Sequence, residues 1–371
     1  MCNPCWAIAM IDCPNMLMIG SAARNVGKTE FACRLIARIA LEVPVIGVKI
    51  TLTHGSEEGL LKDGFRLSEE TGADTSKDTL RMLRAGASRV FWLQVVQESL
   101  GRAVDALLAA IPSGSAIVCE SSSAREFVRP GVFLVVREAG FGEIKESCRK
   151  VIGLADRVIT FYGDGWDFAP DQCYWAQGRW FIPFEASAAI LAGGQSRRMG
   201  QDKSLLPIDG QPMIAHIAAQ LSPLFPELLI GSNDPARHAF LNLPLVADRE
   251  AGQGPLMGIL SCLEASRHEL LFVTACDIPQ MPLAFIRDML ELAADKDVVI
   301  PMTADGRYEP LFAVYRKSLI PRAREILAQG GRRIIELLEG QRHACPIMPP
   351  AVLRNLNTPE DYRQFSGDRL D

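Results

Sequence analysis

The sequence predicts two α/β domains, each with a mainly parallel sheet between two layers of helices. Short apolar runs typical of buried strands alternate with segments of helical spacing along the chain. A chain of 371 residues is longer than a domain with a single hydrophobic core usually is. The 48% hydrophobic content supplies enough apolar side chains for two cores. Residues 183–186 form the candidate linker, so we predict a first domain of residues 1–183 and a second of residues 184–371.

Composition and charge exclude several classes of protein. The formal net charge of -5 leaves no broad basic surface, so nucleic acid is not an expected partner. No apolar run reaches the roughly 18 residues that a membrane-spanning helix needs. The amino-terminal residues lack the basic stretch of a signal peptide, and the acidic Asp12 follows early. We therefore expect a cytoplasmic protein that has no membrane partner.

The first domain opens with an apolar strand at residues 16–19, followed by a glycine-containing loop and a helix. Gly27, Lys28 and Thr29 end this loop in the order of a phosphate-binding P-loop. In such a loop backbone N–H groups surround the phosphates, Lys28 reaches the terminal ones and the Thr29 hydroxyl holds magnesium. The pattern requires glycine at position 22, where this chain has alanine, and alanine restricts positive φ there.

The rest of the first domain continues the alternation of strands and helices. Residues 115–119 form an apolar strand that ends at Glu120, where P-loop proteins place an acid that senses magnesium or water. A solvated glutamate at a strand end is the alternative. The polar loop at residues 55–77 is long enough to be a lid or a binding loop. We further expect helices at residues 30–40 and 78–86, and strands at residues 45–50, 90–93, 132–136, 157–161 and 175–182, the last at a sheet edge.

The second domain begins with a buried strand at residues 188–192 that ends in Gly193 and Gly194. Two adjacent glycines let the backbone approach a ligand closely and direct N–H groups at it, which suits a pyrophosphate. Arg198 and Lys203 add positive charge that would offset the charge developing during nucleotidyl transfer. The alternative is an ordinary strand-to-helix turn with solvated cations.

Asp277 follows an almost wholly apolar strand over residues 270–275. Burying a carboxylate at the end of a central strand costs solvation free energy unless a cation or a hydrogen-bond donor compensates for it. A Mg²⁺ ion that bridges to nucleotide phosphates would compensate in this way. Asp277 is therefore the predicted magnesium ligand. The alternative is a helix N-cap ahead of Pro279.

Several spaced motifs of the second domain resemble those of molybdenum cofactor guanylyltransferases. They are Leu-Ala-Gly-Gly-x-Ser-x-Arg-Met-Gly-x-Asp-Lys-x-Leu-Leu over residues 191–206, Pro-Leu-Met-Gly over residues 255–258, Cys-Asp-Ile-Pro over residues 276–279 and Asn-Leu-Asn-Thr-Pro-Glu-Asp over residues 355–361. The motifs occur in the family's order, and the resemblance covers residues 185–371. It implies a Rossmann-like nucleotidyltransferase fold.

The resemblance also implies roles for individual residues. It makes Arg198, Lys203 and Asp277 catalytic, with Asp277 as the metal ligand. It assigns Asn355 and Asn357 to the pterin part of the acceptor, although Asn-Thr-Pro-Glu is also a helix N-cap sequence. It gives a nucleotide-binding set that consists of Leu191, Ala192, Gly193, Gly194, Lys203, Asn233, Asp248 and Asp277. For Asn233 the alternative is a turn residue after a strand.

The first domain resembles the molybdopterin-guanine dinucleotide biosynthesis adaptor, a P-loop family. The resemblance rests on the P-loop, on Lys-Ile-Thr-Leu-Thr-His over residues 49–54, on Lys-Asp-Thr over residues 77–79 and on Ala-Gly-Ala over residues 85–87. It implies a P-loop NTPase-like fold that binds GTP. This half has no Asn-Lys-x-Asp motif to read guanine, so a preference for GTP here follows from the resemblance only.

Together the resemblances imply an enzyme that transfers GMP from GTP to molybdenum-molybdopterin with Mg²⁺ as cofactor and releases pyrophosphate. Molybdenum insertion proteins and molybdoenzyme chaperones are candidate protein partners. A nucleotidyltransferase of the cytidylyl or sugar-phosphate type would share the glycine loop, Lys203 and Asp277, whereas Asn355 and Asn357 favour the pterin acceptor. A third hypothesis is a cofactor carrier without catalysis, against which the intact Lys203 and Asp277 argue.

Overall fold

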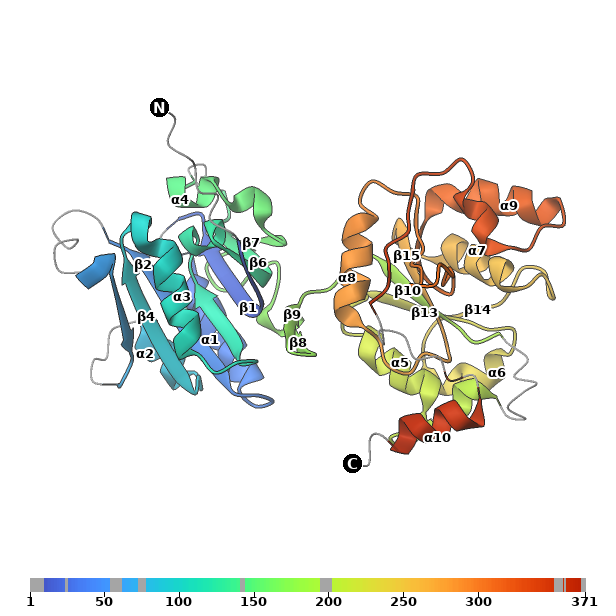
Figure 1. Cartoon of the computed structure of the whole chain (residues 1–371), viewed down its shortest axis with the longest axis horizontal. Helices are drawn as coiled ribbons and strands as arrows, with labels where there is room; N and C mark the ends of the chain where they lie inside the picture. Colours follow the sequence, from blue (N-terminus) through green and yellow to red (C-terminus); the bar gives the residue numbers. More distant parts are fainter. Residues whose placement is uncertain are drawn as a thin grey trace. The chain divides into compact units, whose positions relative to one another are not determined.

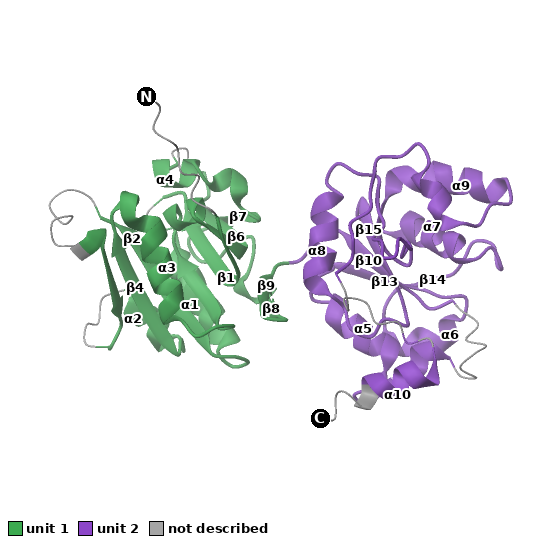
Figure 2. Cartoon of the chain, viewed as in Figure 1, with its two compact units in different colours: residues 1–182 green, residues 183–371 purple. Residues whose placement is uncertain are grey.

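The computed structural model divides the chain into two compact units, Met1–Ile182 (unit 1) and Pro183–Asp371 (unit 2), shown in Figure 2. It describes residues 10–23, 26–53, 62–72, 78–140, 144–193, 202–349, 356 and 358–367. Each unit has a seven-stranded, mostly parallel sheet with helices packed on it, so both units are α/β (Figure 1). Within the described ranges, no helix is both long enough and apolar enough to cross a bilayer.

The sheet of unit 1 has the strand order β3-β4-β2-β5-β1-β6-β7. All neighbouring strands are parallel except β3 and β4. The strands are β1 (Ile11–Ser21), β2 (Val45–Leu52), β3 (Phe65–Glu69), β4 (Arg89–Val95), β5 (Ala116–Glu120), β6 (Val128–Glu138) and β7 (Arg157–Phe161). Because β1 lies inside the sheet, the glycine loop that follows it begins beside the ends of β5 and β6.

Side chains of β1 alternate between two apolar cores, as expected for a strand buried on both faces. Met16 and Met18 belong to one core, whereas Leu17 and Ile19 belong to the other. The first core contains residues of α3 (Leu100–Ala110) and α4 (Glu146–Arg149), and the second contains residues of α1 (Lys28–Ile39) and α2 (Asp78–Arg84). Unit 1 therefore has three layers, with the sheet in the middle.

The predicted edge strand over residues 175–182 is instead a hairpin of β8 (Tyr174–Ala176) and β9 (Arg179–Phe181). Gln177 and Gly178 between these strands have φ values of 52° and 71°, the left-handed conformation of a tight two-residue hairpin turn. Trp180 in β9 is fully buried, and its Nε1–H donates to the Asn15 carbonyl at 3.0 Å. The hairpin is therefore an integral part of the unit 1 core.

The sheet of unit 2 has the strand order β14-β13-β10-β15-β17-β16-β18. The strands are β10 (Ser187–Leu191), β13 (Glu227–Gly231), β14 (Leu245–Val246), β15 (Leu270–Ala275), β16 (Val298–Val299), β17 (Phe312–Arg316) and β18 (His343–Ala344). β14, β13, β10 and β15 run parallel, and β17 is antiparallel to both of its neighbours. The parallel strands therefore end at one edge of the sheet, called the carboxyl edge below. The opposite edge, where they begin, is called the amino edge.

The described helices of unit 2 are α5 (Met213–Leu221), α6 (Pro235–His238), α7 (Pro255–Ala265), α8 (Leu283–Leu292), α9 (Ile320–Ala328) and α10 (Pro359–Gly367). Of these, α7 and α8 contact β15. Leu271 and Val273 of β15 share a core with residues of α7 and α9. Phe272 instead stacks with Phe225 at a centroid distance of 5.7 Å and meets Phe312 edge-on at 5.1 Å. Packing on both faces of β15 fixes the position of the residues that follow it.

Candidate active site

The chain that leaves β10 is held between the two neighbouring strands at the carboxyl edge of unit 2. The Ala192 N–H donates to the Gly231 carbonyl at 2.8 Å, and the Leu191 carbonyl accepts the Cys276 N–H at 3.2 Å. Gly193 is exposed, and no atom of a described residue lies within 4 Å of the place where a Cβ would stand. Packing against the described residues therefore does not require glycine here, and it leaves this backbone uncovered.

Lys203 and Asp277 form an ion pair at this edge, although 74 residues separate them in the sequence. Lys203 lies in the 3-10 helix Lys203–Leu205, and Asp277 follows β15. Lys203 Nζ is 3.3 Å from Asp277 Oδ2, and the two side chains are 16% and 22% exposed. The structure thus brings two of the three predicted catalytic side chains together at a partly open place.

Asp277 can serve as a ligand of a magnesium ion that takes its other ligands from substrate and water. Mg²⁺ prefers oxygen ligands, and it is usually bound by one or two carboxylates together with phosphates and water. Among the described residues, no group of three or more His, Cys, Asp or Glu side chains is placed to hold a metal ion. The Asp277 carboxylate would supply at most two of the oxygen ligands of such an ion.

Glu309 is a second carboxylate at the carboxyl edge, for which the sequence predicts no individual role. It precedes β17, which lies beside β15, and the Ala275 N–H donates to the Leu311 carbonyl at 2.9 Å. Burial raises the pKa of Glu309, the charge of Arg307 lowers it, and the charge of Asp277 raises it. Glu309 and Asp277 are therefore close enough for their charges to interact.

Asn233 and Asp248, which follow β13 and β14, are joined by two hydrogen bonds. Asn233 Nδ2 donates to Asp248 Oδ2 at 2.7 Å, and the Asp248 N–H donates to Asn233 Oδ1 at 2.8 Å. A Cβ on Gly258 in α7 would stand 3.4 Å from Asp248 Oδ1 and 3.7 Å from Leu191 Cδ2. The predicted nucleoside-binding pair therefore lies near the start of the loop after β10.

Four predicted site residues fall outside the described part of the chain: Gly194, Arg198, Asn355 and Asn357. Leu356, between the two asparagines, is described and buried. Its N–H donates to the Asp277 carbonyl at 2.9 Å. The backbone at position 356 therefore lies beside the predicted metal ligand.

In unit 1, the predicted phosphate loop leads into α1 with a glycine that the backbone requires. Gly27 has a φ of 72°, and a Cβ there would come within 2.9 Å of the Phe161 ring. Lys28 Nζ lies 3.3 Å from Oε2 of Glu120, which is 1% exposed and whose carboxylate oxygens make no hydrogen bond to a described atom. A cavity of about 410 Å³ adjoins this pair and is lined by Ser21, Ala23, Val26, Gly27, Lys28, Thr29, Glu30, Asp78, Arg81 and Lys145.

Alanine at position 22 has a structural explanation. Among the described residues, the non-glycine positions with positive φ are Asp63, Gln177, Asp209 and Asn242, so Ala22 does not adopt the left-handed conformation. The Ala22 N–H donates to the Val136 carbonyl at 2.8 Å, which extends the pairing of β1 with β6. A glycine is therefore not needed at this point of the loop.

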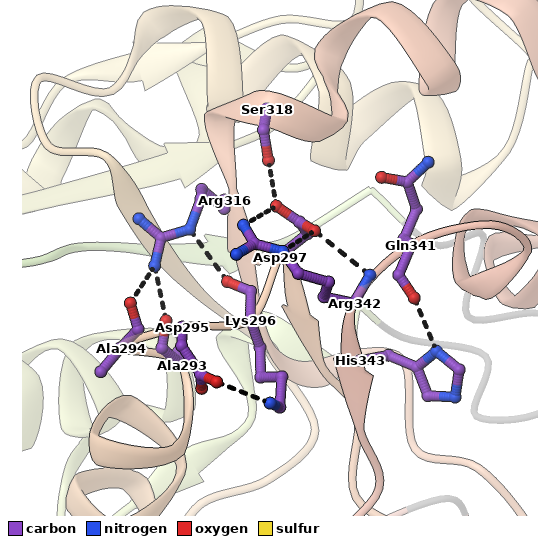
Figure 3. Close-up of polar contacts among 10 residues, drawn as sticks. All are labelled: Ala293, Ala294, Asp295, Lys296, Asp297, Arg316, Ser318, Gln341, Arg342 and His343. Atoms are coloured by element: carbon purple, nitrogen blue, oxygen red, sulfur yellow. Dashed lines mark hydrogen bonds and ion pairs between the residues drawn. The ribbon is translucent and has the colours of Figure 1, made fainter.

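The polar cluster around Asp297 belongs to the amino edge of unit 2 and not to the candidate site (Figure 3). Asp297 precedes β16, and it accepts hydrogen bonds from Arg342 and from Ser318. Arg316 ends β17 and donates to the carbonyls of Ala293, Ala294 and Lys296 after α8, as Figure 3 shows. These contacts join the ends of one helix and three strands, and we assign them a structural role.

Comparison with known proteins gives matches to the second unit. The family described as the MobA-like NTP transferase domain matches residues 188–344. The molybdenum cofactor guanylyltransferase of Pseudomonas fluorescens is 38% identical over 181 residues, which are 47% of this chain and 90% of the relative. That of Shewanella putrefaciens is 32% identical over 194 residues, 51% of this chain and 100% of the relative.

Among solved structures, the molybdopterin-guanine dinucleotide biosynthesis protein A of Archaeoglobus fulgidus matches with a TM-score of 0.44 and 23% identity, over 50% of this chain and 98% of that one. The sequence relatives confirm the prediction of a nucleotidyltransferase, since almost their whole length is covered at 30% identity or more. Through its second unit, the chain belongs to the molybdenum cofactor guanylyltransferase family.

Proposed function

We propose that the chain transfers GMP from GTP to molybdenum-molybdopterin, forming the guanine dinucleotide form of the cofactor and pyrophosphate. The ion pair between Lys203 and Asp277 carries this proposal, because it joins a cation for phosphate oxygens to a carboxylate for a metal ion at one edge of the sheet. The names of the relatives support the guanine nucleotide and the acceptor.

The phosphates of GTP bind between β10 and β15. Asp277 would hold Mg²⁺, and the bound ion would offset negative charge on the phosphates. Lys203 donates from its ammonium group to phosphate oxygens, and Arg198 adds a second cation. The N–H groups at Gly193 and Gly194 donate to the same phosphates, which the open backbone at Gly193 supports.

The nucleoside of GTP binds beside the loop after β10. Asn233 and Asp248 supply amide and carboxylate groups there, and their mutual hydrogen bonds fix both side chains before the ligand arrives. Leu191 and Ala192 form the adjoining backbone wall, held by the bonds to β13 and β15. This arrangement lets the nucleoside and the phosphates contact adjacent stretches of one sheet edge.

The reaction is a direct displacement at phosphorus. An oxygen of the terminal phosphate of the pterin attacks the α-phosphorus of GTP, and the bond from that phosphorus to the pyrophosphate oxygen breaks. Pyrophosphate leaves with the electron pair, and no covalent enzyme intermediate is formed. The attacking phosphate is already ionised near neutral pH, so the side chains position charges and need not remove a proton. Asn355 and Asn357 bind the pterin part, and the bond from the Leu356 N–H to the Asp277 carbonyl supports an acceptor site at this edge.

The test is a turnover assay with the full chain, GTP, magnesium and molybdopterin or its molybdenum form. We expect release of pyrophosphate and formation of the dinucleotide, with little activity when CTP replaces GTP. Lys203→Met should remove turnover while the protein remains folded. Activity with CTP or with a sugar phosphate, and none with the pterin, would reject the proposed substrate pair.

Unit 1 binds a second nucleoside triphosphate at the start of α1. One support is the buried Glu120 carboxylate, which forms an ion pair with Lys28. A second support is the adjoining cavity, because Lys28, Arg81 and Lys145 all line it. Thr29 would hold magnesium at the first turn of the helix, and Lys28 would contact the terminal phosphates.

Counting the GTP molecules bound per chain by equilibrium dialysis tests this second site. We expect two for the wild type and one for Lys28→Ala combined with Glu120→Gln, a pair that leaves no unpaired buried charge. Transfer by unit 2 should be unaffected. An unchanged stoichiometry would remove the proposed nucleotide site from unit 1.

A further inference from the structure

The turn that carries Lys203 is fastened on both sides of that residue. Asp202 Oδ1 accepts the backbone N–H of Ser204 at 3.0 Å and its hydroxyl at 2.8 Å. Arg237 of α6 forms an ion pair with the other carboxylate oxygen of Asp202. Lys203 therefore lies between two residues whose side chains are bonded to each other, and the turn is tied to α6.

His238 ties the same turn to α6 from the inside. It is 1% exposed, its Nε2 lies 3.0 Å from Ser204 Oγ, and its Nδ1 lies 3.0 Å from Ser232 Oγ. The Ser204 hydroxyl donates its proton to Asp202 Oδ1. Towards His238, Ser204 Oγ can therefore act only as an acceptor, and the donor of that hydrogen bond is His238 Nε2–H. Burial lowers the pKa of His238, which favours a neutral ring whose Nδ1 carries the lone pair. The Ser232 hydroxyl oxygen lies 3.0 Å from this Nδ1 and 3.3 Å from the Asp234 carbonyl, so its proton is shared between two acceptors.

The segment that ends at His238 also carries the predicted nucleoside-binding asparagine. The Ser232 N–H donates to the Val246 carbonyl at 2.9 Å, and Asn233 is bonded to Asp248. Seven residues, 232–238, thus connect the ends of β13 and β14 with the turn that carries Lys203. A displacement of His238 would reach Lys203 through the buried hydrogen bond to Ser204, beside the more exposed ion pair of Arg237 with Asp202.

We propose that His238 is a positioning residue for the transfer reaction, which sets the place of the Lys203 ammonium through Ser204 and does not touch substrate. The inference rests on the proposed role of Lys203. Its consequence is specific, because a cation that acts on charge developing in the transition state loses effect when displaced by about 1 Å, a shift that can lower kcat about 100-fold. Binding of GTP through the other contacts changes less.

Two substitutions of His238 separate positioning from simple filling of space. His238→Gln can place an amide N–H near the position of Nε2 and keep the bond to Ser204. His238→Asn reaches only the position of Nδ1, so it keeps the bond to Ser232 and loses the bond to Ser204. In the full chain we expect His238→Asn to lower kcat about 10- to 100-fold with little change in KM for GTP. His238→Gln should stay within a few-fold of wild type.

The chain offers a matched control at the amino edge. His268 Nδ1 lies 3.0 Å from Ser187 Oγ, a second serine–histidine contact on the same sheet but at the end remote from the site. His268→Asn should leave kcat unchanged. Ser204→Ala removes the bond to His238 from the other side, and it should reproduce the loss in kcat seen with His238→Asn.

The test distinguishes failure of this inference from failure of the proposed role of Lys203. If Lys203→Met retains full kcat, the role of Lys203 is wrong, and this inference falls with it. If Lys203→Met removes turnover while folded His238→Asn and Ser204→Ala turn over as wild type does, only the positioning role is overturned. If the His238 variants do not fold, a wild-type kcat in folded Ser204→Ala still overturns the positioning role, because this variant also lacks the bond to His238.

Discussion

Replacing Asp297 with asparagine should destabilise unit 2 in a manner that depends on pH. Asp297 is 7% exposed, and its carboxylate accepts four hydrogen bonds. Three come from the backbone N–H, Nε and Nη2 of Arg342, at 3.1 to 3.2 Å, and one from the Ser318 hydroxyl at 2.8 Å. Asparagine has nearly the same shape, but it carries no charge. Its NH₂ group, itself a donor, would face the donors of Arg342 and Ser318 and could not bond to them.

The size of the effect follows from the pKa. The Arg342 side chain, against a smaller opposing effect of burial, lowers the pKa of Asp297 from 3.8 to about 2. That shift corresponds to at most about 2.4 kcal/mol. Because the Arg342 side chain is 65% exposed and screened by water, we expect about 1–2 kcal/mol at pH 7. The folded pKa lies below the unfolded one, so this stabilisation is present above about pH 4 and is lost as the pH falls towards 2.

Urea unfolding of the full chain measures this effect, and the tryptophans provide an internal control. All five tryptophans lie within residues 1–182, so their fluorescence reports unit 1, whereas circular dichroism reports both units. The unit 2 transition should move by about 0.5–1 M urea at pH 7 and by less near pH 3. The fluorescence transition should not move. An equal shift at both pH values would refute the electrostatic reasoning, and a fall in kcat would contradict placing the cluster away from the active site.

Three further predictions concern the carboxyl edge. Asp277→Asn should lower kcat by about 100-fold or more without lowering the melting temperature, and retained turnover would remove its proposed metal role. Because the pKa of Glu309 is raised in the folded state, wild-type stability should fall as the pH rises through that pKa. Glu309→Gln should therefore make stability less dependent on pH, and identical pH–stability curves for the variant and the wild type would contradict this expectation. Gly231→Ala should cost about 1–3 kcal/mol in thermal unfolding, since its Cβ would stand 2.5 Å from Leu191 Cδ2, and an unchanged melting temperature would show that the site relaxes.

The meeting of Lys203 with Asp277 could be anticipated from sequence, because both residues follow apolar strands of a parallel sheet. Parallel strands end at the same edge, so residues that follow them converge even when they are far apart in the chain. The sequence also predicts β15, because its almost wholly apolar run is typical of a strand buried on both faces.

Other features depend on contacts that no local pattern encodes. His238 lies in a four-residue helix, and only the folded chain shows that Ser204 and Ser232 lie on either side of its ring. Glu309 precedes a strand antiparallel to β15, so the rule for parallel strands does not find it. The hairpin at residues 174–181 differs from the single strand that the sequence predicts for a local reason, because Gln177 and Gly178 adopt positive φ and reverse the chain.

The burial of Trp180 determines when unit 1 can finish folding during synthesis of the chain. The core of unit 1 spans the whole first half, because the indole near its end bonds to Asn15 near its start, 165 residues earlier. A nascent polypeptide therefore cannot complete this core until β9 has left the ribosome, when synthesis of the following unit has already begun. Truncations made to study the first half should retain the chain through Phe181, because an earlier end point would leave a hole the size of a tryptophan in the apolar interior.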